Sequence, residues 1–182
     1  MKNLNFIILI IASSFVSSYS QIRNDTILFW QESHGLTWDE YKGKRPDSTE
    51  IGAASYIGFE IYPSLIKDLP SITIRTSFFP YKSWKKYPTD LLLIHEQGHF
   101  DLAEVYSRKI RKKFICLQEK DCKDFNKYYE VYDELHVEYK EASSKYDLET
   151  NFGRNYENQL QWKRKISSQL IELNDYKFEE LK

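Results

Sequence analysis

The spacing of apolar residues divides the chain into a strand-rich first half and a helical second half. Residues 71–80, SITIRTSFFP, alternate between apolar and polar side chains, with Ile72, Ile74, Thr76 and Phe78 on one side. This period of two predicts a half-buried strand. Two earlier runs, TILFW and AASYIGFEIY, predict further short strands, and the glycine- and proline-containing stretch between them predicts a loop.

The second half of the chain carries apolar positions at helical spacing. One helix is predicted from residue 90 to about 117, with Thr89 or Asp90 capping its start. Helices at 124–145 and 155–173 are rich in opposite charges four residues apart, and the segment YDLETNFGRN between them predicts a turn. Strands followed by helices indicate an α+β fold.

Length and charge narrow the class of protein. The chain has 182 residues, and after a leader of 20 residues we expect a single domain over 21–182. Lysine and arginine total 26 against 27 acidic residues, so the net charge of −1 predicts no nucleic-acid partner. Aromatic residues make up 16 % of the chain, which favours a packed globule. No pattern predicts an oligomeric state.

The first twenty residues have the layout of a secretory signal peptide. Lys2 precedes a short apolar run, and Ser18 and Ser20 form a small-x-small cleavage site before Gln21. The run is shorter than the roughly 20 residues that span a membrane, and no later segment is long and apolar enough. We therefore expect export to the periplasm or the medium, with no stable membrane span after cleavage.

Two cysteines stand near the predicted end of the first helix. Cys116 and Cys122 are separated by five residues. Since export leads to an oxidising compartment, the pair predicts a disulfide that closes a short loop.

The first helix contains an H-E-x-x-H pattern in the stretch LLLIHEQGHFD. His95 and His99 are one helical turn apart, so both imidazoles reach the same point and can bind a Zn²⁺ ion. Glu96 lies beside them, where it can act as the general base on water. Gly98 lowers helix propensity, which suggests that a strand or a substrate approaches closely there.

A catalytic zinc usually has a third protein ligand. Glu104 lies about 180° around the helix from His95, and we expect it to pair with Arg108 instead. Asp101 lies about 120° from the histidines, so it could contact a ligand but not the ion itself. An aspartate and a tyrosine together at a helix-ending turn, Asp147 and Tyr146, can face a cleft, where Tyr146 could stabilise an oxyanion. The candidates for the third ligand are Glu130, Glu134, His136, Glu138, Asp147 and Glu149.

Five segments resemble, in the same order, the family of secreted bacterial zinc-dependent proteases defined by the domain DUF922. They are LTWDEYKGKRP, AASYIGFEI, FFPYKSW, HEQGHFDLAEVYSRKIRKKF and YDLETNFGRNYENQLQWKRKI. The resemblance implies a zincin-like metallopeptidase domain with a β-rich N-terminal part, an active-site helix carrying His95, Glu96 and His99, and C-terminal helices. The last block of the family often reads Tyr-Asp-x-x-Thr-x-His-Gly, whereas this chain has Phe152 in the histidine position. Asp147 then has to supply the third ligand, or the site is incomplete.

The function expected from these patterns is hydrolysis of peptide bonds in a peptide or protein substrate by a secreted zinc metallopeptidase. The strand SITIRTSFF could bind an extended substrate by strand addition. Two alternatives stay open at this stage: a non-catalytic cell-envelope binding protein that keeps a zincin-like fold, and an amidase that acts on cell-wall peptides.

Overall fold

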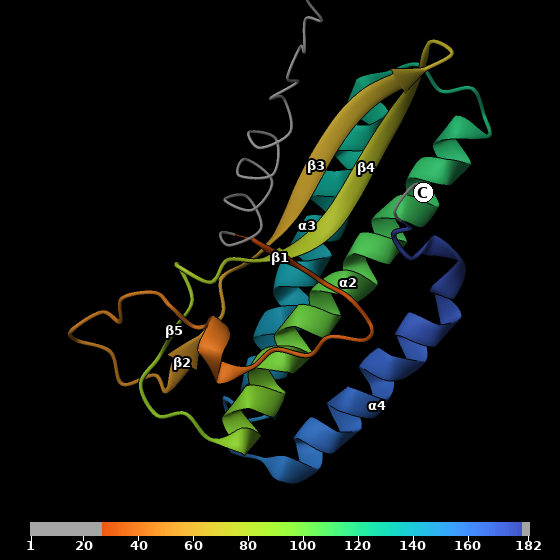
Figure 1. The fold of residues 1–182 in the computed structure, drawn as a ribbon. Helices are drawn as coiled ribbons and strands as arrows, with labels where there is room; N and C mark the ends of the chain where they lie inside the picture. The colour runs from red at the N-terminus through yellow and green to blue at the C-terminus, as the bar shows by residue number, and fades with distance from the viewer. Residues whose placement is uncertain (1–26, 180–182) are drawn as a thin grey trace, which may run out of the picture.

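The computed structural model describes residues 27–179, in which a β-rich first part precedes three long helices (Figure 1). This order confirms the predicted α+β class. The predicted signal peptide at 1–20 lies outside the described residues. Within residues 27–179, none of the helices has the length and apolar character needed to cross a membrane. The helices are α2 (Asp90–Gln118), α3 (Phe125–Glu149) and α4 (Tyr156–Glu172), with short 3₁₀ turns η1 (Trp38–Glu40) and η2 (Asn174–Tyr176).

The strands form two small antiparallel sheets. The larger has the order β1-β4-β3, in which a long hairpin of β3 and β4 carries the short β1 on its far edge. The smaller consists of two-residue strands, β2 paired with β5. The strands are β1 (Leu28–Phe29), β2 (Ala53–Ala54), β3 (Ile57–Ile66), β4 (Leu69–Phe78) and β5 (Trp84–Lys85).

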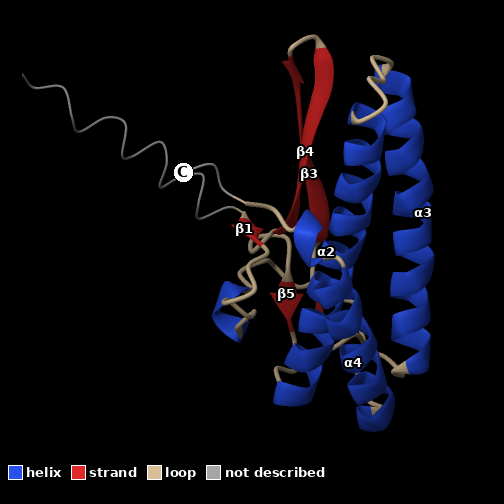
Figure 2. Ribbon diagram, turned by 90° about the vertical axis from the view of Figure 1, so that its right-hand side faces the viewer, coloured by secondary structure: helices blue, strands red, loops and turns tan. Residues whose placement is uncertain are grey.

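The alternation predicted for β4 is present and decides which face of the hairpin is covered. Ile72, Ile74, Thr76 and Phe78 are buried, and this face packs on α2. Figure 2 shows the hairpin standing beside the upper parts of α2 and α3, with β5 near the lower end of α2. Thr73 and Arg75, which alternate with the buried residues, are partly exposed, as the period of two requires. Ser77 departs from the alternation, since it is buried and donates to the carbonyl of Gly58.

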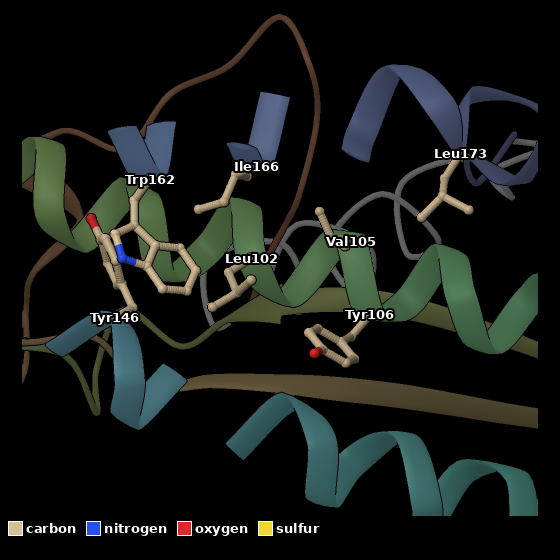
Figure 3. Packing of buried hydrophobic residues seen from close by; sticks show 7 residues of the cluster. All are labelled: Leu102, Val105, Tyr106, Tyr146, Trp162, Ile166 and Leu173. Carbon is tan, nitrogen blue, oxygen red and sulfur yellow. The ribbon is translucent and has the colours of Figure 1, made fainter. Parts of the chain in front are cut away.

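Helix α2 is the central element of the molecule because it contacts α3, α4 and β4. Thr89 is its N-cap, and the Thr89 hydroxyl accepts a hydrogen bond from the backbone N–H of Leu92 at 3.2 Å. Between α2 and α4 lies an apolar cluster that includes Leu102, Tyr146 and Trp162 (Figure 3). This packing holds α2 between its two neighbouring helices.

A buried group of charges joins α2 to the sheet and to the C-terminal part of the chain. Glu104 lies 3.0 Å from Arg108 and 2.6 Å from Arg111, which confirms the predicted pair with Arg108. The Thr76 hydroxyl of β4 donates to the same carboxylate at 2.7 Å. Arg108 and Arg111 in turn donate to the backbone carbonyls of Leu170 and Tyr176.

The predicted disulfide between Cys116 and Cys122 is wrong in this structure, since both thiols are free. Two positions separate Cys116 from the buried Phe114, so its side chain lies about 200° around the helix from the core and is exposed. Cys122 packs instead against the apolar cluster that contains Phe114 and Tyr128. The two sulfurs therefore point to different sides of the helix end.

Candidate metal centre

The structure brings three predicted ligands together where α2 begins and α3 ends. His95 and His99 lie on the same side of the first turns of α2, and Asp147 lies in the last turn of α3. The Oδ1 atom of Asp147 is 3.1 Å from His95 Nε2 and 3.0 Å from His99 Nε2. The two ring nitrogens are 3.2 Å apart. These three residues could hold a metal ion.

The spacing of the three ligand atoms suits a small tetrahedral ion. Ligands bound to zinc at about 2.0–2.1 Å in tetrahedral geometry lie about 3.3–3.4 Å from one another. The three edges measured here, from 3.0 to 3.2 Å, need to open by only a few tenths of an ångström. A tetrahedral ion bound here would take three ligands from the protein and keep its fourth position open.

The hydrogen bonds around Thr150 select the tautomer of His95 that a metal needs. The Thr150 hydroxyl donates its only proton to the carbonyl of Tyr146 at 2.6 Å. It can therefore only accept from His95 Nδ1, which lies 3.3 Å away. With the proton on Nδ1, Nε2 is the nitrogen that a metal ion would bind, and it lies 3.1 Å from Asp147 Oδ1. Such an arrangement is typical of metal-bound histidines.

The remaining contacts keep Asp147 ionised and hold His99 in place. Burial alone would raise the pKa of Asp147, but hydrogen bonding to His95 and His99 and the charge of the two imidazoles lower it well below its usual range. The other nitrogen of His99, Nδ1, is 3.1 Å from the Ser143 hydroxyl on α3. A carboxylate beside two imidazoles is a donor set that divalent zinc accepts.

Glu96 is buried beside this group but is held by hydroxyl groups rather than by the histidines. Ser55 donates to Glu96 Oε2 at 2.6 Å, so Tyr41, whose hydroxyl is 2.7 Å from Ser55 Oγ, must donate to Ser55. Burial and the nearby charge of Glu96 raise the pKa of Tyr41 and keep its phenol protonated. Glu96 is thus held by hydrogen bonds and lines the same cavity as His95 and His99.

Tyr146 lies behind the two histidines, and not in the cleft where the sequence placed it. Its ring is fully buried, stacks on His95 with centroids 4.7 Å apart and meets Trp162 edge-on (Figure 3). Its hydroxyl donates to the backbone carbonyl of His95 at 3.2 Å. A Cβ atom on Gly98 would lie 2.2 Å from the same hydroxyl. The expected contact with an oxyanion is therefore not supported, and Tyr146 positions His95.

The other candidates for the third ligand have different partners. Glu130 pairs with Lys127, and Glu149 accepts a hydrogen bond from Trp162 at 2.7 Å. His136 lies among aromatic rings, 5.7 Å from the ring centre of Phe59. Asp101 accepts from Trp30 and Gln97 on a different side of α2, and Glu134 and Glu138 are exposed. Asp147 was expected in a turn, but it lies on the helix.

A cavity of about 570 Å³ opens over the metal-ligand group. Its floor is formed by His95, Glu96 and His99, and β2 and α3 form two of its walls. A second cavity of about 330 Å³ lies on another side of α2, lined by Gln97, Gly98 and Asp101. Only the first contains the candidate ligands and base, so it is where a substrate would meet them.

The strand predicted to bind substrate, β4, has no free edge. It is the middle strand of its sheet. The carbonyls on its far edge accept hydrogen bonds from Trp30 N at Thr76, from Arg111 at Ile74 and from Gln118 at Pro70. An incoming peptide would have to displace these bonds, which argues against strand addition to β4.

Sequence reasoning missed Thr150, Ser143, Ser55 and Tyr41, although each touches a ligand or the base or lies one hydroxyl away. The hydrogen bonds of Thr150, Ser143 and Ser55 to the site link residues that are 41 to 55 positions distant in sequence. Tyr41 reaches the site only through Ser55. The one available signal was their place in the segments shared with the family, since LTWDEY, AASY and YDLET contain three of the four.

The turn after α3 is unusual in its backbone. The amides of Asn151 and Phe152 donate to the carbonyls of Leu148 and Asp147, a pattern that commonly ends helices with one left-handed residue. Here Asn151 and Phe152 both have positive φ, 50° and 52°, and Gly153 follows with a φ of 80°. Asparagine tolerates this conformation, whereas phenylalanine in it costs about 1–2 kcal/mol.

Fold and site together define an α+β protein with a His-His-Asp group on and beside an H-E-x-x-H helix. A family model described as "Bacterial protein of unknown function (DUF922)" matches residues 67–153, a range that includes all three candidate ligands. The match supports the assignment to this family, and the description names no activity. No curated protein and no solved structure matches the chain.

Proposed function

We propose that the protein is an exported, zinc-dependent peptidase with a zincin-like arrangement of its active site. The observation that carries this proposal is the convergence of His95 Nε2, His99 Nε2 and Asp147 Oδ1 within 3.2 Å of one another, with buried Glu96 lining the same cavity. Two imidazoles and one carboxylate with an open fourth corner are the ligand set of a catalytic zinc rather than of a structural one.

When bound at such a group, zinc polarises a carbonyl and lowers the pKa of water toward about 7. The protein then has to hold the ligands and remove a proton. Ser55 occupies Oε2 of Glu96, and Oε1 has no partner among residues 27–179, so Oε1 is free to accept a proton from water in the cavity. Glu96 can pass that proton to the leaving amine, which completes hydrolysis of an amide.

The proposal is tested by metal analysis and by cleavage of a peptide library with the zinc-loaded protein. We expect about one equivalent of bound zinc. The variant Glu96→Gln should keep the zinc and lose at least about 100-fold in cleavage rate, because a general base typically contributes at least that factor. Glu134→Gln, an exposed change on α3, is the matched control and should behave as the wild type.

Three results would contradict the proposal in different ways. The metal site would be contradicted if the wild type bound much less than one equivalent of metal and His99→Ala bound no less than the wild type. Cleavage by Glu96→Gln at the wild-type rate would remove the base. Bound zinc without cleavage of any library member would favour the non-catalytic envelope binding protein.

A further inference from the structure

Two residues of the turn that follows α3, Phe152 and Arg154, line the cavity. The backbone of Phe152 is held in place by a hydrogen bond, in which its amide donates to the carbonyl of Asp147 at 2.8 Å. Gly153 packs directly on His95, because a Cβ atom there would lie 2.9 Å from the Cβ of His95. The turn is therefore fixed against the metal-ligand group on both sides of Phe152.

The conformation of Phe152 has no explanation in packing. Its φ of 52° is unfavourable for an aromatic residue, and the helix-ending pattern needs positive φ only at the preceding Asn151. Burial does not offset this, since 49 % of Phe152 is exposed. A strained residue with its ring exposed at a cavity is a candidate for ligand contact.

A second apolar residue lines the cavity from the segment before β2. Ile51 precedes β2, is 55 % exposed and lines the same cavity. Gly52 brings this segment close to α2, because a Cβ atom there would lie 2.9 Å from the side chain of Leu92. Phe152 and Ile51 thus offer two apolar surfaces beside the candidate ligands.

Arg154 adds a positive charge that no acidic side chain of residues 27–179 neutralises. It is exposed, and neither an ion pair nor a side-chain hydrogen bond involves it in that part of the chain. The acidic residues that line the cavity have other partners: Glu50 lies 3.9 Å from Lys86, Glu96 accepts from Ser55, and Asp147 contacts the two histidines. Because Arg154 is the cation that lines this cavity, a carboxylate on the substrate is the group that it would bind best.

We propose that Phe152, Ile51 and Arg154 form a specificity subsite for peptides in which a large apolar side chain is followed closely by a carboxylate. This inference rests on the proposed function for the peptide nature of the ligand. The carboxylate comes either from the C-terminus of the peptide or from an aspartate or glutamate side chain. Both sources present the same planar anion to the guanidinium.

The test measures binding of short N-acetylated alanine peptides to zinc-loaded Glu96→Gln protein, by calorimetry, alongside their cleavage by the wild type. The peptides carry Phe or Ala, followed by Glu or Gln, and end in a free carboxylate or an amide. Arg154→Gln should weaken binding of the carboxylate-bearing peptides about tenfold, and the uncharged ones should be unaffected. If Arg154→Gln weakens binding of the Glu peptides more than that of the Gln peptides, the carboxylate is a side chain. If it weakens binding of the peptides with a free C-terminus more than that of the amidated ones, the carboxylate is the C-terminus.

Phe152→Asn, which tolerates positive φ, should weaken binding of the Phe peptides about tenfold and leave the Ala peptides unchanged. The matched controls are Lys163→Gln and Leu148→Asn, exposed changes that do not line this cavity. Both should bind all peptides as the parent protein does.

The outcomes separate this inference from the proposed function. If peptides are cleaved but the Arg154 and Phe152 variants discriminate among them as the parent does, the proposed subsite is wrong and the proposed peptidase function is kept. If the predicted discrimination is seen in binding and nothing is cleaved, the subsite stands and the peptidase is wrong. A protein that neither binds nor cleaves any of the peptides overturns both.

Discussion

Single hydrogen bonds around His95 decide whether its imidazole is ready to bind a metal. Thr150 forces the proton onto Nδ1, while the ring of Tyr146 stacks on the imidazole and the Tyr146 hydroxyl binds the carbonyl of the same residue. The histidine is thus held at three points before any ion arrives. Preorganisation of this kind raises affinity because less order has to be imposed on binding.

Thr150→Val tests this arrangement with a side chain of the same shape. Without the hydroxyl, His95 loses the acceptor that selects its tautomer, so zinc affinity should fall about 10–100-fold. The Tyr146 carbonyl keeps its helical bond from the Thr150 amide, so the fold should persist. Competition with a chromophoric chelator measures the affinity, and Thr73→Val on the outer face of β4 is the control. Equal affinities of the Thr150 variant and the wild type would show that the tautomer is set elsewhere.

At the scale of elements, the close approach of α2 and α3 depends on a residue without a side chain. Gly98 faces the ring of Tyr146, and a Cβ atom would lie 2.2 Å from its hydroxyl and 2.7 Å from Cζ. The sequence predicted a close approach here but named a strand or a substrate as the neighbour. The neighbour is α3, whose last turn also carries Asp147.

Gly98→Ala should therefore separate the two helices, although alanine is the better helix former. We expect a loss of about 2 kcal/mol or more in the free energy of unfolding, as for other overpacked sites, together with weaker zinc binding. Gly35→Ala is the control, because its Cβ atom would make an ordinary contact of 3.6 Å with Gln97. Urea unfolding compares the two, and a neutral Gly98→Ala would mean that α3 can move without cost.

The helices and strands show which parts of the fold could be predicted from the sequence. Periodicity located β4 and α2, and the helical spacing of His95 and His99 predicted their shared face, because both depend on local geometry. The end of α3 was placed too early, so Asp147 was expected in a turn. That boundary is set by a left-handed Asn151 and by packing against His95. Contacts of this range leave no periodic pattern in the sequence.

At the scale of the whole molecule, one buried carboxylate connects three parts of the chain. Glu104 binds two arginines, and these bind carbonyls at the end of α4 and in η2. Burial lowers the pKa of Arg111, and the charge of Glu104 opposes this shift. The network places the C-terminal segment against α2 and the sheet.

Glu104→Gln leaves both arginines buried without their counter-ion. Removing one partner of a buried pair typically costs about 3–5 kcal/mol, which corresponds to a fall of about 10 °C in Tm for a protein of this size. Glu130→Gln removes an exposed pair with Lys127 and should change stability by less than about 1 kcal/mol. Circular dichroism melts compare the two, and equal Tm values would contradict the structural role of Glu104.

The metal-ligand group also has a consequence for the topology of the chain. His95 and Asp147 are 52 positions apart, on helices that also contact each other through packing and through the hydrogen bonds of Tyr146 and Ser143. An ion bound to both closes a loop that spans most of α2, all of the connection and nearly all of α3. Such a closure restricts the unfolded chain as a covalent cross-link does, so stability rises with the concentration of free ion. The proposed ion would thus act as a removable cross-link, and the supply of free ion would set the free energy of unfolding.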